Sequence, residues 1–153
     1  MGSCFDGKIH ENIVYRLPGV APSAVRFPYI IVSERIDDAE SADLITVANF
    51  RHVKEMIKKK AQQGLGLEFL ISETRKMNGA AVAKWLVQIY DAYSFCERTG
   101  CQLILSSGAN STLEMISGRC FDAILNEIGI DPERHWQEMK KWLQTATSKR
   151  VMI

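Results

Sequence analysis

The sequence has little cysteine and no long apolar run. Its four cysteines form no CxxC pair and follow no recognisable secretory signal; they are Cys4, Cys96, Cys101 and Cys120. This usage predicts reduced thiols in an intracellular protein, cytoplasmic or, in a eukaryote, nuclear. The longest apolar run is far shorter than the roughly 18 residues that cross a bilayer, so no membrane span is expected.

A net excess of charge is missing as well. Lys and Arg number 19 and Asp and Glu 18, which gives a formal net charge of +1. Nucleic-acid binding would therefore need a local basic patch or a partner. Linkers, repeats and low-complexity segments are also absent, so 153 residues with 46% apolar content indicate one domain over 1–153.

Several motifs of catalysis are missing too. The loop "SSGANS" at 106–111 lacks the first glycine of GxSxG, and only His10, His52 and His135 could serve a serine hydrolase as base. There is no GxxxxGK[ST] motif for nucleotide phosphates and no HxH, HExxH or cysteine cluster for a metal. The H-x-x-E pairs beginning at His52 and His135 are interpreted as ordinary contacts on solvated helices. The sequence thus assigns no catalytic residue and no metal ligand.

Strand and helix patterns are present along the whole chain. Apolar, β-rich runs without clean alternation predict strands covered on both faces, at 12–17, 28–33, 43–48, 66–72 and 101–106. Helical patterns occupy 49–63, 78–100, 118–129 and 131–147. The last has Asp131 as its N-cap and Pro132 at its first helical position. The second half therefore predicts βαβ units and a parallel sheet. Only about ten residues link the first three strands, so helices there are reduced to turns or one pairing is antiparallel.

Glu68 lies inside the apolar run 66–72. A carboxylate in such a place must be paired, hydrogen-bonded or directed into a cavity. We interpret it as a structural partner of a buried backbone group or a cation, because a single carboxylate is too little for acid–base catalysis.

Basic residues follow the strands and define what we call the basic rim: Arg35, Arg51, Arg75, Lys76 and Arg119. The carboxyl ends of parallel strands share one edge, so the basic rim predicts a phosphate-facing surface, with a dispersed solvated rim as the alternative. The loop 106–111 adds N–H groups and hydroxyls that suit an anion. The lysine run at 58–60 is interpreted as a helix-end charge run, nonspecific toward RNA.

The stretch "ILSSGANS", with "GRCFDAILNEIGID" and a final helix after it, resembles the carboxyl half of ribonuclease P protein component 3. This is the thirty-kilodalton-class subunit of archaeal ribonuclease P and eukaryotic ribonuclease P and MRP. Upstream, "DLITVA", "GLEFLISETRKM" and "AKWLVQIYDAYSFCERTGCQLILSSG" occur in the family's order. The similarity covers roughly 43–147 and is most specific over 87–130.

The resemblance implies an α/β fold, a TIM-barrel-like domain of the polymerase-and-histidinol-phosphatase type that has lost its histidine metal ligands. About five strands are found where a closed barrel has around eight, so we expect a shortened or incomplete barrel. Uncovered edges predict a tight partner or an oligomer, with edge pairing or a covering helix at the first strand.

The resemblance also implies a non-catalytic subunit that supports the catalytic RNA in removing the 5′ leader of precursor tRNA. Its partners would be ribonuclease P RNA, precursor tRNA and protein component 2, with Mg²⁺ bound by the RNA and no cofactor by the protein. Where the family commonly reads serine, proline, arginine, aspartate, this chain reads "SGRC" at 117–120 and lacks the acid. The residues predicted to bind RNA or a partner are Arg35, Arg51, Ser72, Arg75, Lys76, Ser106, Ser107, Gly108, Ser111 and Arg119.

Two alternatives belong to other functional classes. One is a metal-dependent phosphoesterase of the related barrel superfamily that uses Glu68 and histidines. The other is a non-catalytic paralogue that forms a homodimer and binds no RNA.

Overall fold

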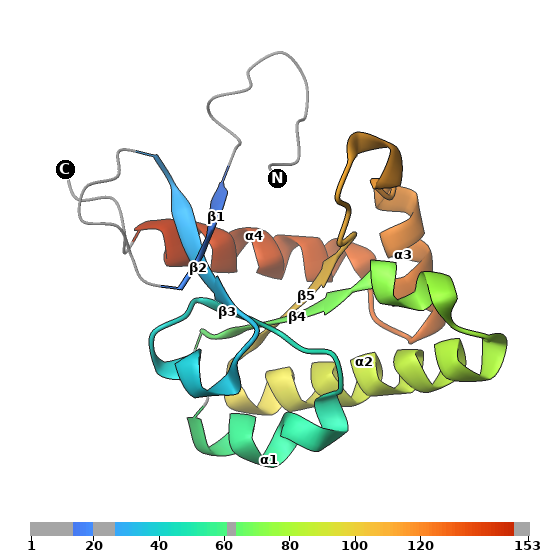
Figure 1. Ribbon diagram of the computed structural model, residues 1–153, viewed down its shortest axis with the longest axis horizontal. Coiled ribbons are helices and arrows are strands. Elements are labelled where there is room, and N and C mark those ends of the chain that lie inside the picture. The colour runs from blue at the N-terminus through green and yellow to red at the C-terminus, as the bar shows by residue number, and fades with distance from the viewer. Residues whose placement is uncertain (1–13, 20–26, 61–63, 149–153) are drawn as a thin grey trace.

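A computed structural model describes residues 14–19, 27–60 and 64–148 of the chain. In this part of the chain a five-stranded sheet has the order β1-β2-β3-β4-β5, so each strand pairs with the next in sequence (Figure 1). The strands are β1 (Tyr15–Pro18), β2 (Tyr29–Ser33), β3 (Leu44–Thr46), β4 (Gly66–Leu70) and β5 (Gln102–Ser106). The fold is α/β and is compatible with a shortened barrel-like domain.

All four strand pairings are parallel, so the antiparallel alternative for the first half is wrong. The other alternative holds between β2 and β3, where the link contains only a short 3-10 helix, η1 (Ile36–Glu40). Two carboxylates hold this short link. The Asp43 carboxylate accepts the backbone N–H of Ile31 at 2.9 Å, and Asp38 accepts the hydroxyl of Ser33 at 2.6 Å.

The four helices lie close to their predicted positions: α1 (Phe50–Lys60), α2 (Gly79–Thr99), α3 (Gly118–Glu127) and α4 (Pro132–Ser148). Local signals explain the ends of α2. The Asn78 side chain accepts the N–H of Ala81 at 2.9 Å, and Gly100 ends the helix with a φ of 73° that favours glycine. The predicted strand at 66–72 is shorter than expected, because its last two residues begin the 3-10 helix η2 (Ile71–Lys76).

The two faces of the sheet pack against different helices (Figure 1). Helices α1 and α2 share the larger core cluster with Ile45, Leu67 and Leu103. On the opposite face, Ala146 of α4 packs with Leu44 and Ile104. Successive strand residues point to opposite faces. Three polar residues therefore lie on the α4 face too, because each is two positions beyond a residue of that face: Thr46 after Leu44, Glu68 after Gly66, and Ser106 after Ile104.

Helix α4 lies directly against the amino ends of the strands. The indole N–H of Trp142 donates to the carbonyl of Gly64 at 2.6 Å. A Cβ atom at Gly66 would lie 2.6 Å from the side chain of Leu44, 2.8 Å from that of Trp142 and 2.9 Å from that of Ile104, so any other residue there would displace these side chains. Val14 packs with the same cluster, which brings α4 to the start of the first strand.

Burial of the strands is uneven. Most residues of β2, β4 and β5 are buried, as the missing alternation predicts, whereas β1 is mostly exposed and forms one edge of the sheet. Cys96 and Cys101 are buried in the core as free thiols and Cys120 is exposed; Cys4 lies outside the described residues. None of the helices in the described ranges is both long and apolar enough to cross a membrane.

Candidate functional site

Glu68 is fully buried and is held by three side chains on the α4 face of the sheet. Both terminal nitrogens of Arg16 donate to its carboxylate at 2.6 Å, one to each oxygen. Thr46 donates its hydroxyl to Oε2 at 2.8 Å, and Ser106 donates its hydroxyl to Oε1. The prediction that Glu68 is a structural partner is confirmed, with Arg16 as the cation.

The charge of Glu68 is stabilised in spite of its burial. Burial by itself would raise the pKa of Glu68. The two hydrogen bonds and the positive charge of Arg16, with the hydroxyls of Ser106 and Thr46, outweigh burial and lower the pKa below its ordinary value. Glu68 is therefore an ionised carboxylate at neutral pH, and a poor general base, because efficient bases have a pKa near the working pH.

The Arg16–Glu68 pair also reveals the shape of the sheet. Strands β1 and β4 are three strand spacings apart. The register pairs Arg16 with Ile30, Val32 with Leu44, and Thr46 with Glu68. Glu68 therefore lies four residues further along its strand than the position level with Arg16. In a flat sheet this diagonal would be about 19 Å, since strands are about 4.8 Å apart and residues about 3.3 Å apart. Side chains that stand perpendicular to a flat sheet could not meet over such a distance. The sheet therefore bends toward the α4 face along this diagonal.

The loop 106–111 is packed against η2. The N–H of Ser72 donates to the carbonyl of Ser107 at 3.1 Å. Gly108 has a φ of +63°, and a Cβ atom there would lie 2.1 Å from the hydroxyl of Ser72. The Ser107 hydroxyl accepts the N–H of Ala109 at 3.3 Å. Ser72, Ser107 and Gly108 are thus in contact with one another and shape the loop, while Ser106 points to Glu68 and Ser111 is exposed at the loop's end.

All strands are parallel, so the chain leaves each strand at the same end of the sheet before it reaches a residue of the basic rim. Two of its cations are compensated by carboxylates. Arg75 donates to the carbonyl of Glu114 at 2.7 Å and lies 3.4 Å from its carboxylate, and Arg51 lies 3.8 Å from the carboxylate of Asp91. The other three are exposed and form no ion pair with a residue of the described ranges: Arg35, Lys76 and Arg119.

His135 differs from the sequence-based interpretation. His52 is exposed on α1, as expected, but His135 is buried, and neither ring nitrogen has a hydrogen-bond partner among the described residues. Burial lowers the pKa of His135. The reason is its place on α4, where it precedes Trp142 and Ala146 by seven and eleven residues and so shares their packed side. No group of three or more His, Cys, Asp or Glu side chains in the described ranges could hold a metal ion.

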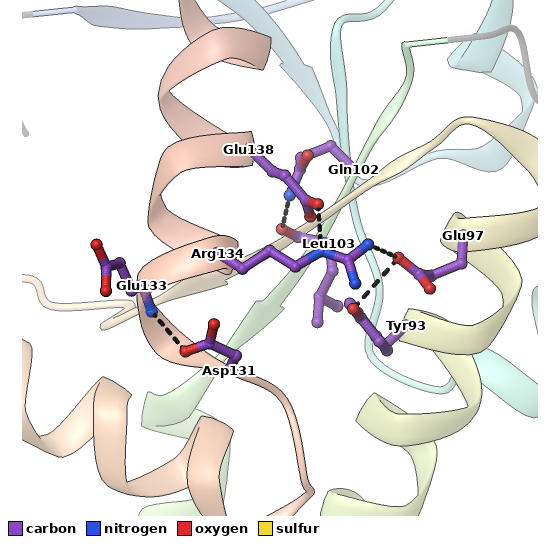
Figure 2. Close-up of polar contacts among 8 residues, drawn as sticks. All are labelled: Tyr93, Glu97, Gln102, Leu103, Asp131, Glu133, Arg134 and Glu138. Atoms are coloured by element: carbon purple, nitrogen blue, oxygen red, sulfur yellow. Dashed lines mark hydrogen bonds and ion pairs between the residues drawn. The ribbon is translucent and has the colours of Figure 1, made fainter.

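A second polar cluster joins α2 to α4 and was not predicted from the sequence (Figure 2). Arg134 donates to the carboxylates of Glu97 and Glu138, each at 2.7 Å, and Tyr93 donates to Glu97 at 3.2 Å. Tyr93–Glu97 and Arg134–Glu138 are local pairs four residues apart, but the contact of Arg134 with Glu97 joins residues 37 positions apart, and no local pattern marks it. The predicted N-cap of α4 is confirmed beside it, where Asp131 accepts the N–H of Glu133 at 3.2 Å.

A hollow of about 170 Å³ lies next to this cluster. Glu97 and Glu138 line it together with Gln102, Leu103, Tyr93 and the two buried thiols, Cys96 and Cys101. Burial raises the pKa of both thiols, that of Cys96 well above its ordinary value. The thiols stay protonated at neutral pH, and the hollow therefore offers no reactive nucleophile.

Comparison with known proteins finds no relative: no protein-family model matches the chain, and no curated protein matches it. What the structure shows is an α/β fold with a five-stranded parallel sheet. Membership of a family stays a proposal, which depends on the sequence stretches at 43–147.

Proposed function

We propose that this chain is a shortened protein component 3 of ribonuclease P, a subunit that supports the catalytic RNA in removing the 5′ leader of precursor tRNA. The observation that carries the proposal is the strand order. A parallel sheet in which every strand pairs with its successor is the arrangement of strands in a TIM-type barrel, and the resemblance over 43–147 implies such a barrel.

The contacts of Glu68 support a scaffold rather than a phosphoesterase. Both of its oxygens are already engaged, by Arg16, Thr46 and Ser106, and its lowered pKa suits a permanent ion pair. Metal ligation by Glu68 would have to break these bonds. Under this proposal the chemistry belongs to the RNA and its Mg²⁺ ions, and the protein supplies surfaces.

The basic rim supplies one of these surfaces. Arg35, Lys76 and Arg119 are exposed and form no ion pair with a described residue, so they are able to contact phosphates. Among the described residues β1 is an exposed edge strand, and it supplies a second surface, because an unpaired sheet edge is a template for another chain. In the proposed assembly, protein component 2 covers this edge and the rim faces the RNA.

Copurification of the full chain tests the proposal. A tagged chain is expressed in its native host, and the captured RNA and proteins are identified by sequencing and mass spectrometry. The expected result is one structured RNA together with other ribonuclease P subunits. Capture of neither would overturn the proposal. A manganese- or zinc-dependent phosphatase activity that is lost in Glu68→Gln would favour the phosphoesterase, and a stable homodimer without RNA affinity at low salt would favour the dimerising paralogue.

A further inference from the structure

Helix α1 concentrates positive charge, and of its cations only Arg51, near the start of the helix, belongs to the basic rim. Its eleven residues contain one arginine and four lysines against a single acid, Glu55, a net charge of +4 in a chain whose total is +1. The remainder of the chain is therefore acidic by three charges. Such a separation of charge creates a local positive field that the net charge of the chain conceals.

The outward side of α1 bears most of this charge. Phe50 and Ile57 are buried and fix the side that faces the core. Arg51, Lys54 and Lys58 follow one another at three- and four-residue spacing, which places them on one flank of the helix over about 10 Å. Lys59 is exposed on the outer side. Figure 1 shows α1 at the outer surface of the domain, beside α2.

Three of these lysines form no ion pair within the part of the chain that the structure describes. Lys60 lies 2.5 Å from the carboxylate of Asp37 and ties the end of the helix to η1. Lys54, Lys58 and Lys59 form no ion pair with any residue of the described ranges. The end of α1 also lies away from the rim, because a helix between two parallel strands returns the chain from their carboxyl ends to their amino ends.

We propose that the outward side of α1 is an RNA-binding surface that contacts backbone phosphates and extends from Arg51 of the basic rim toward the opposite end of the domain. The nature of the RNA rests on the proposed function, because lysine contacts to phosphates carry no sequence information. Arg51 already lies 3.8 Å from the carboxylate of Asp91. The lysines without an ion pair among the described residues, from Lys54 to Lys59, extend over about 7.5 Å of helix. That length covers roughly two phosphates of one duplex strand at about 3.4 Å each. The lysine run at 58–60 thus has a function beyond ending the helix.

Double variants that remove equal charge test this surface. Lys58→Gln/Lys59→Gln changes α1 and leaves the Lys60–Asp37 contact intact, while Lys140→Gln/Lys141→Gln removes two exposed lysines from α4 as the matched control. Binding to a fluorescein-labelled RNA hairpin is measured by anisotropy over a series of salt concentrations. The α1 variant should bind about tenfold more weakly at 0.15 M salt, with a slope of log K against log salt that is shallower by roughly 1.5. The control should bind nearly as the unchanged chain does.

The outcomes separate this inference from the proposed function. If the unchanged chain binds the hairpin but the α1 variant weakens no more than the control, the α1 surface is refuted and the proposed function is unaffected. If the unchanged chain does not bind the hairpin, the α1 surface is refuted, and the copurification experiment decides the proposed function separately. Binding to phosphatidylserine vesicles in place of RNA would also overturn the α1 proposal. Circular dichroism of each variant verifies that the helices are retained.

Discussion

Removing Arg16 should have a different effect from neutralising its partner Glu68. In Arg16→Met the buried carboxylate loses its cation and keeps only the hydroxyls of Thr46 and Ser106. Breaking a buried pair in this way costs about 3–5 kcal/mol, because an uncompensated charge is left in the interior. In Glu68→Gln, by contrast, the unpaired group is Arg16, whose side chain is 35% exposed and can turn to water. The loss is then nearer to that of hydrogen bonds to a charged group, about 1.5–3 kcal/mol.

Urea denaturation followed by far-ultraviolet circular dichroism measures both variants at pH 7. We expect Arg16→Met to lose more unfolding free energy than Glu68→Gln, and the double variant Arg16→Met/Glu68→Leu to recover part of the loss, because it leaves no buried charge unpaired. Equal losses for the two single variants, or a loss below about 1 kcal/mol for Arg16→Met, would refute the reasoning, given the cost expected for an unpaired buried charge.

The pH dependence of the folding stability supplies a second, independent test of the same pair. In the unchanged chain the pKa of Glu68 is lowered in the folded state, so its contribution to stability is present above its ordinary pKa and is lost as the pH falls through the folded value. Without Arg16, burial dominates and raises the folded pKa above the unfolded one. Lowering the pH then protonates the buried carboxylate and relieves its penalty. Acid should therefore reduce the difference in stability between Arg16→Met and the unchanged chain.

Three further substitutions test other parts of the structure. Burial lowers the pKa of His135 in the folded state, so the stability that depends on the neutral ring is lost as the pH falls below the pKa of the unfolded chain. His135→Leu should therefore be more stable than the unchanged chain in urea denaturation at pH 5. Equal stability of the two chains there would contradict this. Gly66→Ala should cost about 1–3 kcal/mol by overpacking against Leu44, Trp142 and Ile104, whereas Gly79→Ala, whose Cβ meets open space, should cost nothing in thermal unfolding. Gly108→Ala places a Cβ against Ser72 at a positive φ, so proteolysis of the loop 106–111 should accelerate, and an unchanged rate would mean that the loop does not depend on this contact.

Local features of the chain could be predicted from the sequence. The cap at Asn78 and the terminating Gly100 set the two ends of α2 through contacts with residues three or four positions away. The positions of the strands follow from short apolar runs. The short 3-10 link between β2 and β3 left two alternatives open, because a length of about ten residues fits both turns and antiparallel pairing. The structure shows that the two strands are parallel and that two carboxylates form hydrogen bonds within their short link.

The polar contacts of the site could be predicted only in part. That Glu68 needed a partner follows from its apolar surroundings, but the partner is 52 positions away and meets it only because the sheet bends. His135 was misinterpreted because its charged neighbours suggested solvent, although its spacing to Trp142 and Ala146 marks the packed side of α4. The charge on α1 is visible in the sequence, but which lysines are free of internal partners is visible only in the structure.

The sequential strand order has a consequence for synthesis of the chain. Each strand pairs with the one made just before it, so the sheet can grow strand by strand as the polypeptide leaves the ribosome, without waiting for distant segments. Two contacts cannot form in this order. The Arg16–Glu68 pair requires β4, and the packing of α4 against Leu44 and Ile104 requires nearly the whole chain. Folding on the ribosome therefore leaves the α4 face of the sheet uncovered until α4 itself has been synthesised.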